Sequence, residues 1–235
     1  MLLPVAERSV ESDAVLEAVF DELFGDTSAE LGEQFPSVEL VAEKTGSSVE
    51  TARLSLERLA RAGLAAGDNV DCRTAGLEML PKLVFRGSRH DFRVLGDVYA
   101  SCRLIWPILA GLCAERCAPE VAAGLHRLVD RMDATEDLRE RHWLILQMSN
   151  WLVDNSGSPV FQLLANNILS VLTPLVEVGT QVIASALRST DRYRELAEAV
   201  VSGDPQCAQD AARRCWDRIW DSGIEFCAGM VRPHD

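Results

Sequence analysis

The sequence has few aromatic residues, little positive charge and no long apolar run. Aromatic side chains make up 6% of the 235 residues. Charges, Gly or Pro interrupt every apolar stretch, so we expect no membrane-spanning helix and no membrane partner. The first residues carry neither a basic segment nor a long apolar run, and we expect no secretory signal. The length and composition are those of a globular protein with one large or two modest domains.

The shortage of positive charge constrains the choice of partner. The chain has 36 Asp and Glu against 23 Lys and Arg, which gives a formal net charge of −13. Residues 1–85 are the more acidic part, with 16 acidic and 7 basic side chains. Nucleic-acid-binding domains are more often basic. A polyanion can therefore bind this part only if its few basic residues gather on one face.

Cysteine is present in an odd number, seven, and is scattered along apolar helical faces. This usage indicates reduced thiols and a cytoplasmic protein. Cys113 and Cys117 are four residues apart, and Cys207, Cys215 and Cys227 lie near the C-terminus. Two interpretations remain: a redox or soft-metal sensor, or small packing residues, which we favour. No nucleophile elbow or phosphate-binding loop is present, so we expect no enzymatic activity.

A helical period dominates the chain, and alternating strand patterns are short. Residues 9–24 predict a first amphipathic helix. A pair of helices at 37–62 is expected to turn at Gly46, followed by a short two-stranded wing around residues 67–69. After a connector broken at Pro81 and Gly87, the pattern predicts helices at 94–116, 119–133, 137–154, 159–186, 190–202 and 205–229.

The expected fold class is therefore mostly α, in three parts. Residues 1–75 would form a winged helix–turn–helix with a short β-wing, and residues 76–93 a connector. Residues 94–230 would form an all-α effector domain, a bundle of six or seven helices that can enclose a cavity.

Residues 36–64 resemble the winged helix of GntR-type transcriptional regulators, whose usual pattern is PSER-ELAE-x-x-GVSRTTVREALRRLEAEGL. Further along, residues 155–159 resemble the ASGNP turn of the FCD-type effector domain, and residues 195–215 its closing pattern. Tyr193 and the aromatic-rich residues 215–220 make the metal-free, acyl-CoA-sensing FadR subfamily the most similar group. The positions that match the winged-helix pattern are Pro36, Ser37, Ala42, Glu43, Gly46, Ser48, Thr51, Arg53, Leu56, Leu59, Gly63 and Leu64.

The resemblance implies that the second helix of the pair enters the major groove of an operator in double-stranded DNA. Two of the three arginine positions of the family hold Glu39 and Val49 here. Two interpretations follow: a ligand-responsive regulator with an atypical operator, or a degenerate regulator that binds little or no DNA and acts as a sensor or heterodimer partner. The residues expected to contact DNA are Ser37, Ser48, Thr51, Arg53 and Arg73.

The resemblance also implies a homodimer and an effector pocket inside the helical domain. The expected lining is apolar with a few hydroxyl groups and suits an acyl chain, so we expect a fatty acyl-CoA; the alternative is a filled core that binds nothing. The pocket arginine of the family falls on Cys102, one residue before Arg103. The expected effector-binding residues are Cys102, Arg103, Trp106, Ile145, Ser149, Asn150, Leu172, Val176, Tyr193, Cys215 and Ile219.

Metal-dependent members of the FCD family use one Asp and three His in the helical core. The same register places Ile145, Ser149, Tyr193 and Cys215 at those four positions. Ile cannot bind a metal, and Ser and Tyr are poor zinc ligands. We therefore expect no metal and no other cofactor.

Overall fold

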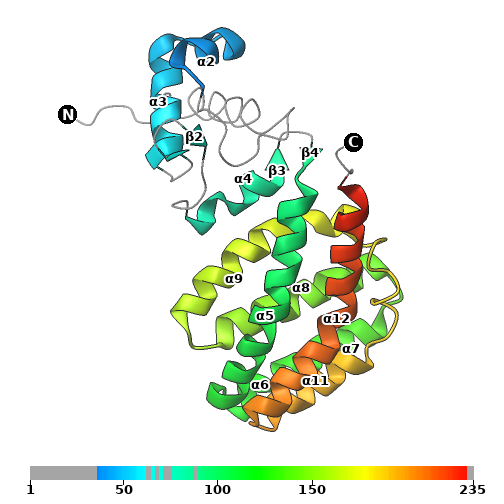
Figure 1. The fold of residues 1–235 in the computed structure, drawn as a ribbon. Helices are drawn as coiled ribbons and strands as arrows, with labels where there is room; N and C mark the ends of the chain where they lie inside the picture. The colour runs from blue at the N-terminus through cyan, green and yellow to red at the C-terminus, as the bar shows by residue number, and fades with distance from the viewer. Residues whose placement is uncertain (1–35, 62–64, 67–68, 71–75, 87–88, 232–235) are drawn as a thin grey trace, which may run out of the picture. The chain divides into compact units, whose positions relative to one another are not determined.

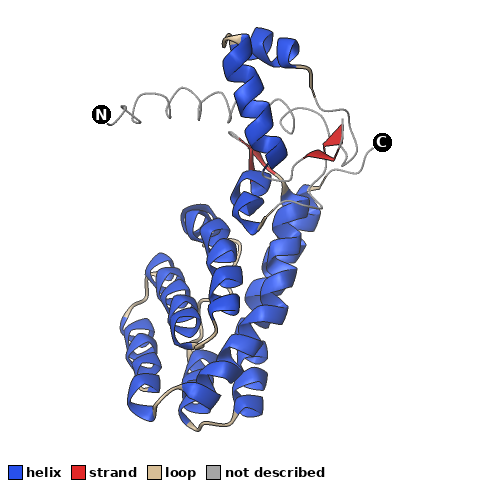
Figure 2. Ribbon diagram, turned by 90° about the vertical axis from the view of Figure 1, so that its left-hand side faces the viewer, coloured by secondary structure: helices blue, strands red, loops and turns tan. Residues whose placement is uncertain are grey.

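The computed structural model describes residues 36–61, 65–66, 69–70, 76–86 and 89–231. The chain divides into two compact units, Met1–Asp91 and Phe92–Asp235. Helices make up most of the described residues, and strands occur there as two short pairs (Figure 2). The mostly α fold class is therefore confirmed. The first helix expected at 9–24 lies outside the described residues.

The first unit contains a capped pair of helices. Helix α2 covers Val38–Thr45 and helix α3 covers Val49–Leu59. Ser37 and Ser48 are their N-caps, because each hydroxyl oxygen accepts a backbone N–H of the first turn that would otherwise have no partner. Gly46 ends α2 with a φ of 64°, a left-handed conformation that glycine adopts without steric cost. The expected helix–turn–helix is present, with its turn at Gly46.

The rest of this unit contains two short antiparallel strand pairs. The first pair, β1 with β2, lies where the wing was expected. The second pair, β3 with β4, and a short helix, α4, lie in the segment expected to be a connector, and the sequence did not predict these elements. Pro81 does not break the segment, because it stands in the first turn of α4, where a missing N–H costs little. The elements are β1 (Ala65–Ala66), β2 (Asn69–Val70), η2 (Leu77–Met79), α4 (Leu80–Val84), β3 (Phe85–Arg86) and β4 (Arg89–His90).

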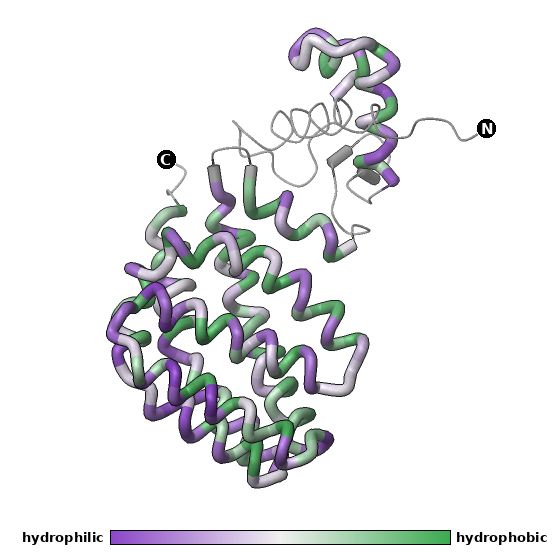
Figure 3. The backbone as a smooth tube through the Cα atoms, turned by 180° about the vertical axis from the view of Figure 1, so that it is seen from behind, coloured by the Kyte–Doolittle hydropathy of each residue, from purple (hydrophilic) through white to green (hydrophobic). Residues whose placement is uncertain are grey.

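The second unit is a helical bundle built on its first and last helices. Helix α5 (Phe92–Arg116) packs along α12 (Pro205–Met230), and the two lie side by side in Figure 1. Hydrophobic and hydrophilic stretches alternate along the helices of the bundle (Figure 3), as expected when one face of each helix is buried. The other elements are α6 (Pro119–Ala122), α7 (Gly124–Ala134), α8 (Leu138–Asn155), α9 (Pro159–Leu172), η3 (Thr173–Leu175), α10 (Val176–Gly179) and α11 (Asp191–Val201).

Two of the predicted helices are interrupted. The helix expected at 119–133 divides at Ala123 into α6 and α7. The helix expected at 159–186 ends at Leu172 and continues as a 3-10 turn, one turn of α-helix and a series of turns over 180–187. Pro174 explains the second break, because it has no N–H to donate to the preceding turn and its ring crowds the carbonyl there.

The core of the bundle contains a buried cluster of three tryptophans. Trp106 and Trp216 are both 0% exposed. The Trp220 ring lies 5.9 Å from that of Trp106 in a T-shaped arrangement and 6.4 Å from that of Trp216 in a stacked one. Such pairs add directional attraction to the burial of large apolar surfaces. The aromatic cluster therefore fixes α12 against α5.

Two segments of the bundle are long and apolar enough, by length and composition alone, to cross a membrane: Phe92–Arg116 and Pro159–Gly179. The sequence expectation that no segment would reach this limit was therefore wrong. Both segments contribute buried side chains to the core: in the most apolar 18 residues of each, 50% and 39% are buried. A core helix of a globular bundle has the same composition as a membrane-spanning one, so the finding is weak evidence for a membrane.

Two glycines of α12 provide a test of the α5–α12 packing. A Cβ atom on Gly223 would lie 2.8 Å from the Tyr99 ring. We expect Gly223→Ala to lower the free energy of unfolding by about 1–3 kcal/mol, because the ring must move. Gly229→Ala meets no atom within 4 Å and should raise this free energy by up to about 1 kcal/mol. Urea unfolding followed by tryptophan fluorescence measures both, and equal effects would contradict the close packing.

Candidate functional sites

The exposed N-terminal half of α3 is the first candidate site. Ser48 and Thr51 lie one above the other, with 2.8 Å between their hydroxyl oxygens. The Ser48 oxygen also accepts the backbone N–H of Thr51 at 3.0 Å. One hydroxyl proton is used between the two side chains, and the other remains available to donate to an outside acceptor. A helix N-terminus with hydroxyl groups in this arrangement suits a phosphate.

Arg53 lies on the solvent-exposed side of α3, next to an acidic neighbour. Its side chain is 56% exposed, and its Nε lies 3.9 Å from a carboxylate oxygen of Glu50. A surface ion pair of this kind is weak and screened by salt, so a phosphate can replace the carboxylate. Glu39 on α2 and Val49 on α3 are exposed, so neither position supplies the positive charge of the family pattern.

Of the five residues expected to contact DNA, the structure brings Ser48 and Thr51 together. Arg53 lies two residues after Thr51 and therefore on another side of the helix. Ser37 is exposed at the start of α2, and Arg73 lies outside the described residues. The inward side of α3 is buried through Ala52, Ser55, Leu56 and Leu59. This burial fixes which face of α3 remains available to a partner.

The second candidate site is a cavity inside the helical bundle, with a volume of about 30 Å³. Four of its lining residues come from α8 at spacings of three, four and seven, so they share one face of that helix. Helices α5 and α12 provide another wall. The end of α9 and the segment after it, residues 173–187, provide the rest; we call residues 173–187 the broken segment. The lining residues are Tyr99, His142, Ile145, Leu146, Ser149, Leu172, Leu175, Gly179, Ile183, Ile219 and Trp220.

The predicted effector residues fall into three groups. Ile145, Ser149, Leu172 and Ile219 line the cavity. Arg103 forms an ion pair with Asp221 and Asn150 is exposed, so neither is among the lining residues. Five others are buried in the core without lining the cavity: Cys102, Trp106, Val176, Tyr193 and Cys215. The part that any of these residues plays in effector binding remains a prediction.

Sequence reasoning missed seven lining residues. Two of them, His142 and Leu146, stand three residues before Ile145 and Ser149, so the helical period alone could have found them. Tyr99 and Trp220 join the wall through the packing of α5 on α12, which leaves no local signal. The remaining three are Leu175, Gly179 and Ile183, which reach the cavity because the chain leaves the helical path after Leu172.

His142 is the titratable group of the cavity wall with the clearest hydrogen-bond arrangement. The Thr180 hydroxyl donates to the carbonyl of Val176 at 2.6 Å, and its oxygen lies 3.0 Å from Nδ1 of His142. Because this hydroxyl has one proton, Nδ1 must be the donor to Thr180, which leaves Nε2 as an acceptor. Burial lowers the pKa of His142 to about 4, so the ring is neutral near pH 7.

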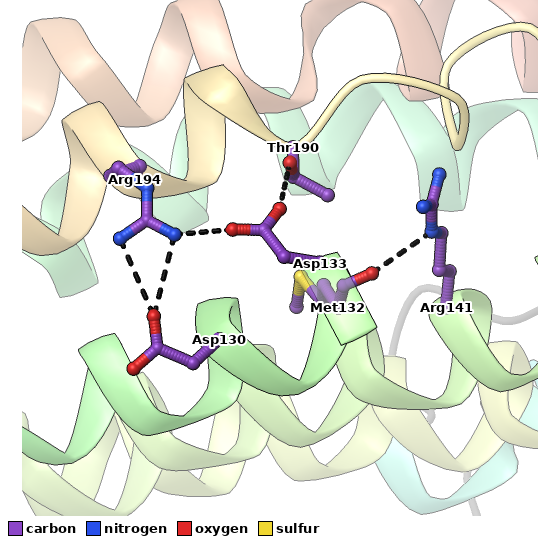
Figure 4. A network of polar contacts seen from close by, with 6 residues as sticks. All are labelled: Asp130, Met132, Asp133, Arg141, Thr190 and Arg194. Atoms are coloured by element: carbon purple, nitrogen blue, oxygen red, sulfur yellow. Dashed lines mark hydrogen bonds and ion pairs between the residues drawn. The ribbon is translucent and has the colours of Figure 1, made fainter. Parts of the chain in front are cut away.

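Polar contacts at the start of α8 hold the broken segment in place. The Arg141 guanidinium donates to the carbonyls of Leu187 at 3.1 Å and Arg188 at 3.0 Å. Its Nε donates to the carbonyl of Thr135 and to that of Met132, and Figure 4 shows the contact with Met132. Met132 and Thr135 lie at the C-terminal end of α7, where backbone carbonyls have no partner within the helix. Leu187 and Arg188 lie where the broken segment ends.

A neighbouring network joins α7 to α11 (Figure 4). Arg194 pairs with the carboxylates of Asp130 and Asp133, and the Thr190 hydroxyl donates to Asp133. The hydrogen bond from Thr190, followed by that from Arg194, holds the pKa of Asp133 below its ordinary value. The carboxylate is therefore ionised under ordinary conditions and keeps the beginning of α11 beside α7.

Cys113 and Cys117, the pair four residues apart on α5, are held by hydrogen bonds inside the bundle. Cys113 and Cys117 donate to the carbonyls of Leu152 and Asn155, at 3.2 and 3.3 Å. Burial raises the pKa of both thiols, which keeps them protonated and unreactive. This supports packing rather than redox sensing.

The four positions that hold metal ligands in other FCD proteins do not fit a metal, because Ile145 has no donor atom and Tyr193 and Cys215 are buried with pKa values raised by desolvation. Within the described residues, no three His, Cys, Asp or Glu side chains gather into a possible metal site. The absence of a metal remains a prediction.

Comparison with known proteins places these features in a family. The FCD domain family matches residues 97–218. The chain is 34% identical over 221 residues to the HTH-type transcriptional regulator Mce2R of Mycobacterium tuberculosis, and equally to the uncharacterized HTH-type transcriptional regulator Mb0601 of Mycobacterium bovis. Each alignment covers 90% of both proteins.

Among solved structures, the chain is similar to GntR of Streptococcus agalactiae, with 18% identity and a TM-score of 0.48 over 88% of this chain and 99% of that one. It is also similar to McbR/YncC of E. coli, with 16% identity and a TM-score of 0.44 over 94% of this chain and 96% of that one.

The neutral His142 predicts a pH dependence of stability. The unfolded chain binds a proton at this residue near pH 6.5, whereas the folded chain binds it near pH 4. The stabilising contribution is therefore present above pH 6.5 and is lost as the pH falls toward 4. We expect the free energy of unfolding to decrease between pH 7.5 and 5 by more in the wild type than in His142→Gln, which cannot titrate. Parallel urea titrations measure the difference, and identical slopes against pH would disprove it.

Proposed function

This chain belongs to the GntR-type transcriptional regulators with an FCD effector domain, and we propose that it binds operator DNA in a ligand-dependent way. The N-terminal half of α3 binds operator DNA, and a ligand in the helical bundle changes that binding by favouring one conformation of the protein. The observation that carries the proposal is the helix pair that turns at Gly46, with Ser48 and Arg53 exposed and Thr51 half-buried on its second helix.

In the proposed complex, the hydroxyl groups and helix N-termini bind phosphates. Ser37 serves α2, and Ser48 with Thr51 serves α3. Arg53 supplies the charged contact, to a phosphate or to a guanine edge, and Arg73 is the candidate for a second such contact. Because two arginines of the family pattern are absent, Arg53 carries a large share of the affinity.

A specific observation favours the second candidate function, a degenerate regulator that acts as a sensor or heterodimer partner. Glu39 and Glu50 are exposed near the proposed DNA-binding face, and Glu50 lies 3.9 Å from Arg53. Carboxylates repel phosphates and reduce the counterion release that drives association with DNA. Both candidate functions use the same helical bundle, so DNA binding distinguishes them.

The proposed effector is an apolar compound; a fatty acyl-CoA is the alternative that the FadR resemblance implies. The apolar lining supports this class. The cavity volume of about 30 Å³ lies far below the roughly 300–1,000 Å³ of typical ligand pockets. A long acyl chain would therefore require the wall at residues 173–187 to move.

We further propose a cytoplasmic homodimer, since two copies of α3 match a two-fold symmetric operator. Large exposed apolar side chains on the packed helices α5 and α9 support a contact through the bundle: Leu104 is 70% exposed and Leu163 67%. Val178 on α10 is equally exposed, at 68%, and offers a control at another site.

Arg53→Ala should weaken operator binding by about 1–3 kcal/mol per protomer and lower the slope of log affinity against log salt by about one for each phosphate that is no longer bound. Arg61→Ala is the matched control, because Arg61 is 77% exposed and pairs with Glu57 rather than with the start of α3. Gel-shift titrations with the promoter region of the protein's own gene, at several salt concentrations, measure both. Equal binding by Arg53→Ala and the wild type would refute the proposed placement of α3.

The same assay separates the two functions. Glu39→Arg combined with Val49→Arg should tighten binding at every salt concentration, since it restores two cationic contacts. If the wild type shows no specific retention and this double variant does, the degenerate regulator becomes the correct function.

Leu104→Glu combined with Leu163→Glu should convert a dimer to a monomer, because it places charges in an apolar contact. Val178→Glu should leave the dimer intact. Light scattering coupled to size-exclusion chromatography gives the mass of each. A double variant that remains dimeric would move the interface to the winged-helix unit.

A further inference from the structure

The wall of the cavity combines apolar surface with a few neutral polar groups. The lining residues include no Lys, Arg, Asp or Glu, and the polar side chains among them are Tyr99, His142 and Ser149. A buried carboxylate or phosphate would lose its hydration without gaining a cationic partner from this wall. The wall therefore selects against an anionic group.

Ser149 is the first sign that the cavity has a missing polar partner. Its side chain is 2% exposed and lines the cavity. Within the part of the chain that the structure describes, its hydroxyl makes no hydrogen bond, although serines inside helices often bond to the carbonyl one turn back. The Ser149 oxygen is not among the fully enclosed polar atoms that lack a partner, so a molecule in the cavity can form a hydrogen bond with it.

His142 is the second sign, because its contact with Thr180 determines that Nε2 can accept a hydrogen bond. Nδ1 donates to Thr180 at 3.0 Å, and this hydroxyl donates onward to Val176. Nε2 is therefore a lone-pair acceptor, and no described residue donates to it. His142 and Ser149 stand two turns apart on one face of α8, about 10 Å along the helix axis.

We propose, on the basis of the effector site described above, that the cavity binds an uncharged, largely apolar molecule that presents a hydroxyl or N–H donor to Nε2 of His142. The Ser149 hydroxyl can donate or accept, so it tolerates a second polar atom of either kind. A fatty acid carboxylate lacks the donor and carries a charge. An acyl thioester offers an acceptor carbonyl, which would leave Nε2 without a partner.

The broken segment over the cavity provides adaptable volume for such a molecule. Three of its backbone hydrogen bonds are long, at 3.3 Å from Thr180 to Val176, 3.3 Å from Ile183 to Gly179 and 3.4 Å from Ala184 to Gln181. Local opening requires less free energy where backbone hydrogen bonds are weak. Gly179 and Ile183 can therefore withdraw from the cavity.

Three probes of similar size test the class: benzyl alcohol, toluene and benzoate, added to the full chain. We expect benzyl alcohol to raise the melting temperature in a saturable way and to bind about 2- to 10-fold more tightly than toluene, the value of one added hydrogen bond. Benzoate should produce no shift. Isothermal titration calorimetry gives the affinities.

Variants assign the effect to His142. His142→Leu should abolish the advantage of benzyl alcohol over toluene, and His142→Gln, which retains an acceptor oxygen, should keep part of it. His126→Leu on α7 is the control, because His126 does not line the cavity. The melting temperature of each variant without a probe reports whether it folds.

The proposal is overturned if benzoate or octanoyl-CoA stabilises the protein and benzyl alcohol does not. It is also overturned if toluene and benzyl alcohol bind equally well, or if no probe binds, since a tightly held water would then account for the polar groups. The probes are measured without DNA. A failure of the Arg53 gel-shift experiment would therefore remove the regulatory function and leave this inference standing.

Discussion

The packing of α5 against α12 is the contact on which the helical bundle depends. The two helices are the first and last of the unit, so their contact closes a long loop that contains every other helix. The absence of a side chain at Gly223 admits the ring of Tyr99, and the Trp106–Trp220 contact lies further along the same pair. Tyr99 and Trp220 also face the cavity. The shape of the ligand site is therefore set by the contact that closes the fold.

Local signals predicted the helix pair well, because capping is a short-range interaction. Ser37, Ser48 and Gly46 act within three residues of their own positions, and each does what its type favours. The β3–β4 pair was missed, although a Gly-Ser dipeptide between Arg86 and Arg89 is a typical hairpin signal. Apolar periodicity continues past Pro174 and concealed the end of α9. In that segment the missing N–H of proline outweighed the periodic pattern.

The candidate cavity was harder to predict than the helices that form it. Ile145 and Ser149 could be placed because they share one face of a regular helix. Cys102 and Tyr193 have the same apolar environment in the sequence pattern, yet they are buried in the core without lining the cavity. Whether an inward-facing residue meets a neighbour or an opening depends on the packing of several helices, which a single sequence does not encode locally. The preference of His142 for its tautomer likewise depends on Thr180, which belongs to a distant segment.

The two ends of helix α8 are held by contacts with different kinds of segment. At its C-terminus the Cys113 and Cys117 thiols bind its last carbonyls, and both come from the continuous helix α5. At its N-terminus Arg141 binds Leu187, in a segment without regular helix. The C-terminal end of α8 is therefore bound to a continuous helix, and its N-terminal end to the segment with long backbone hydrogen bonds. A change in the position of that segment would reach α8 first at Arg141.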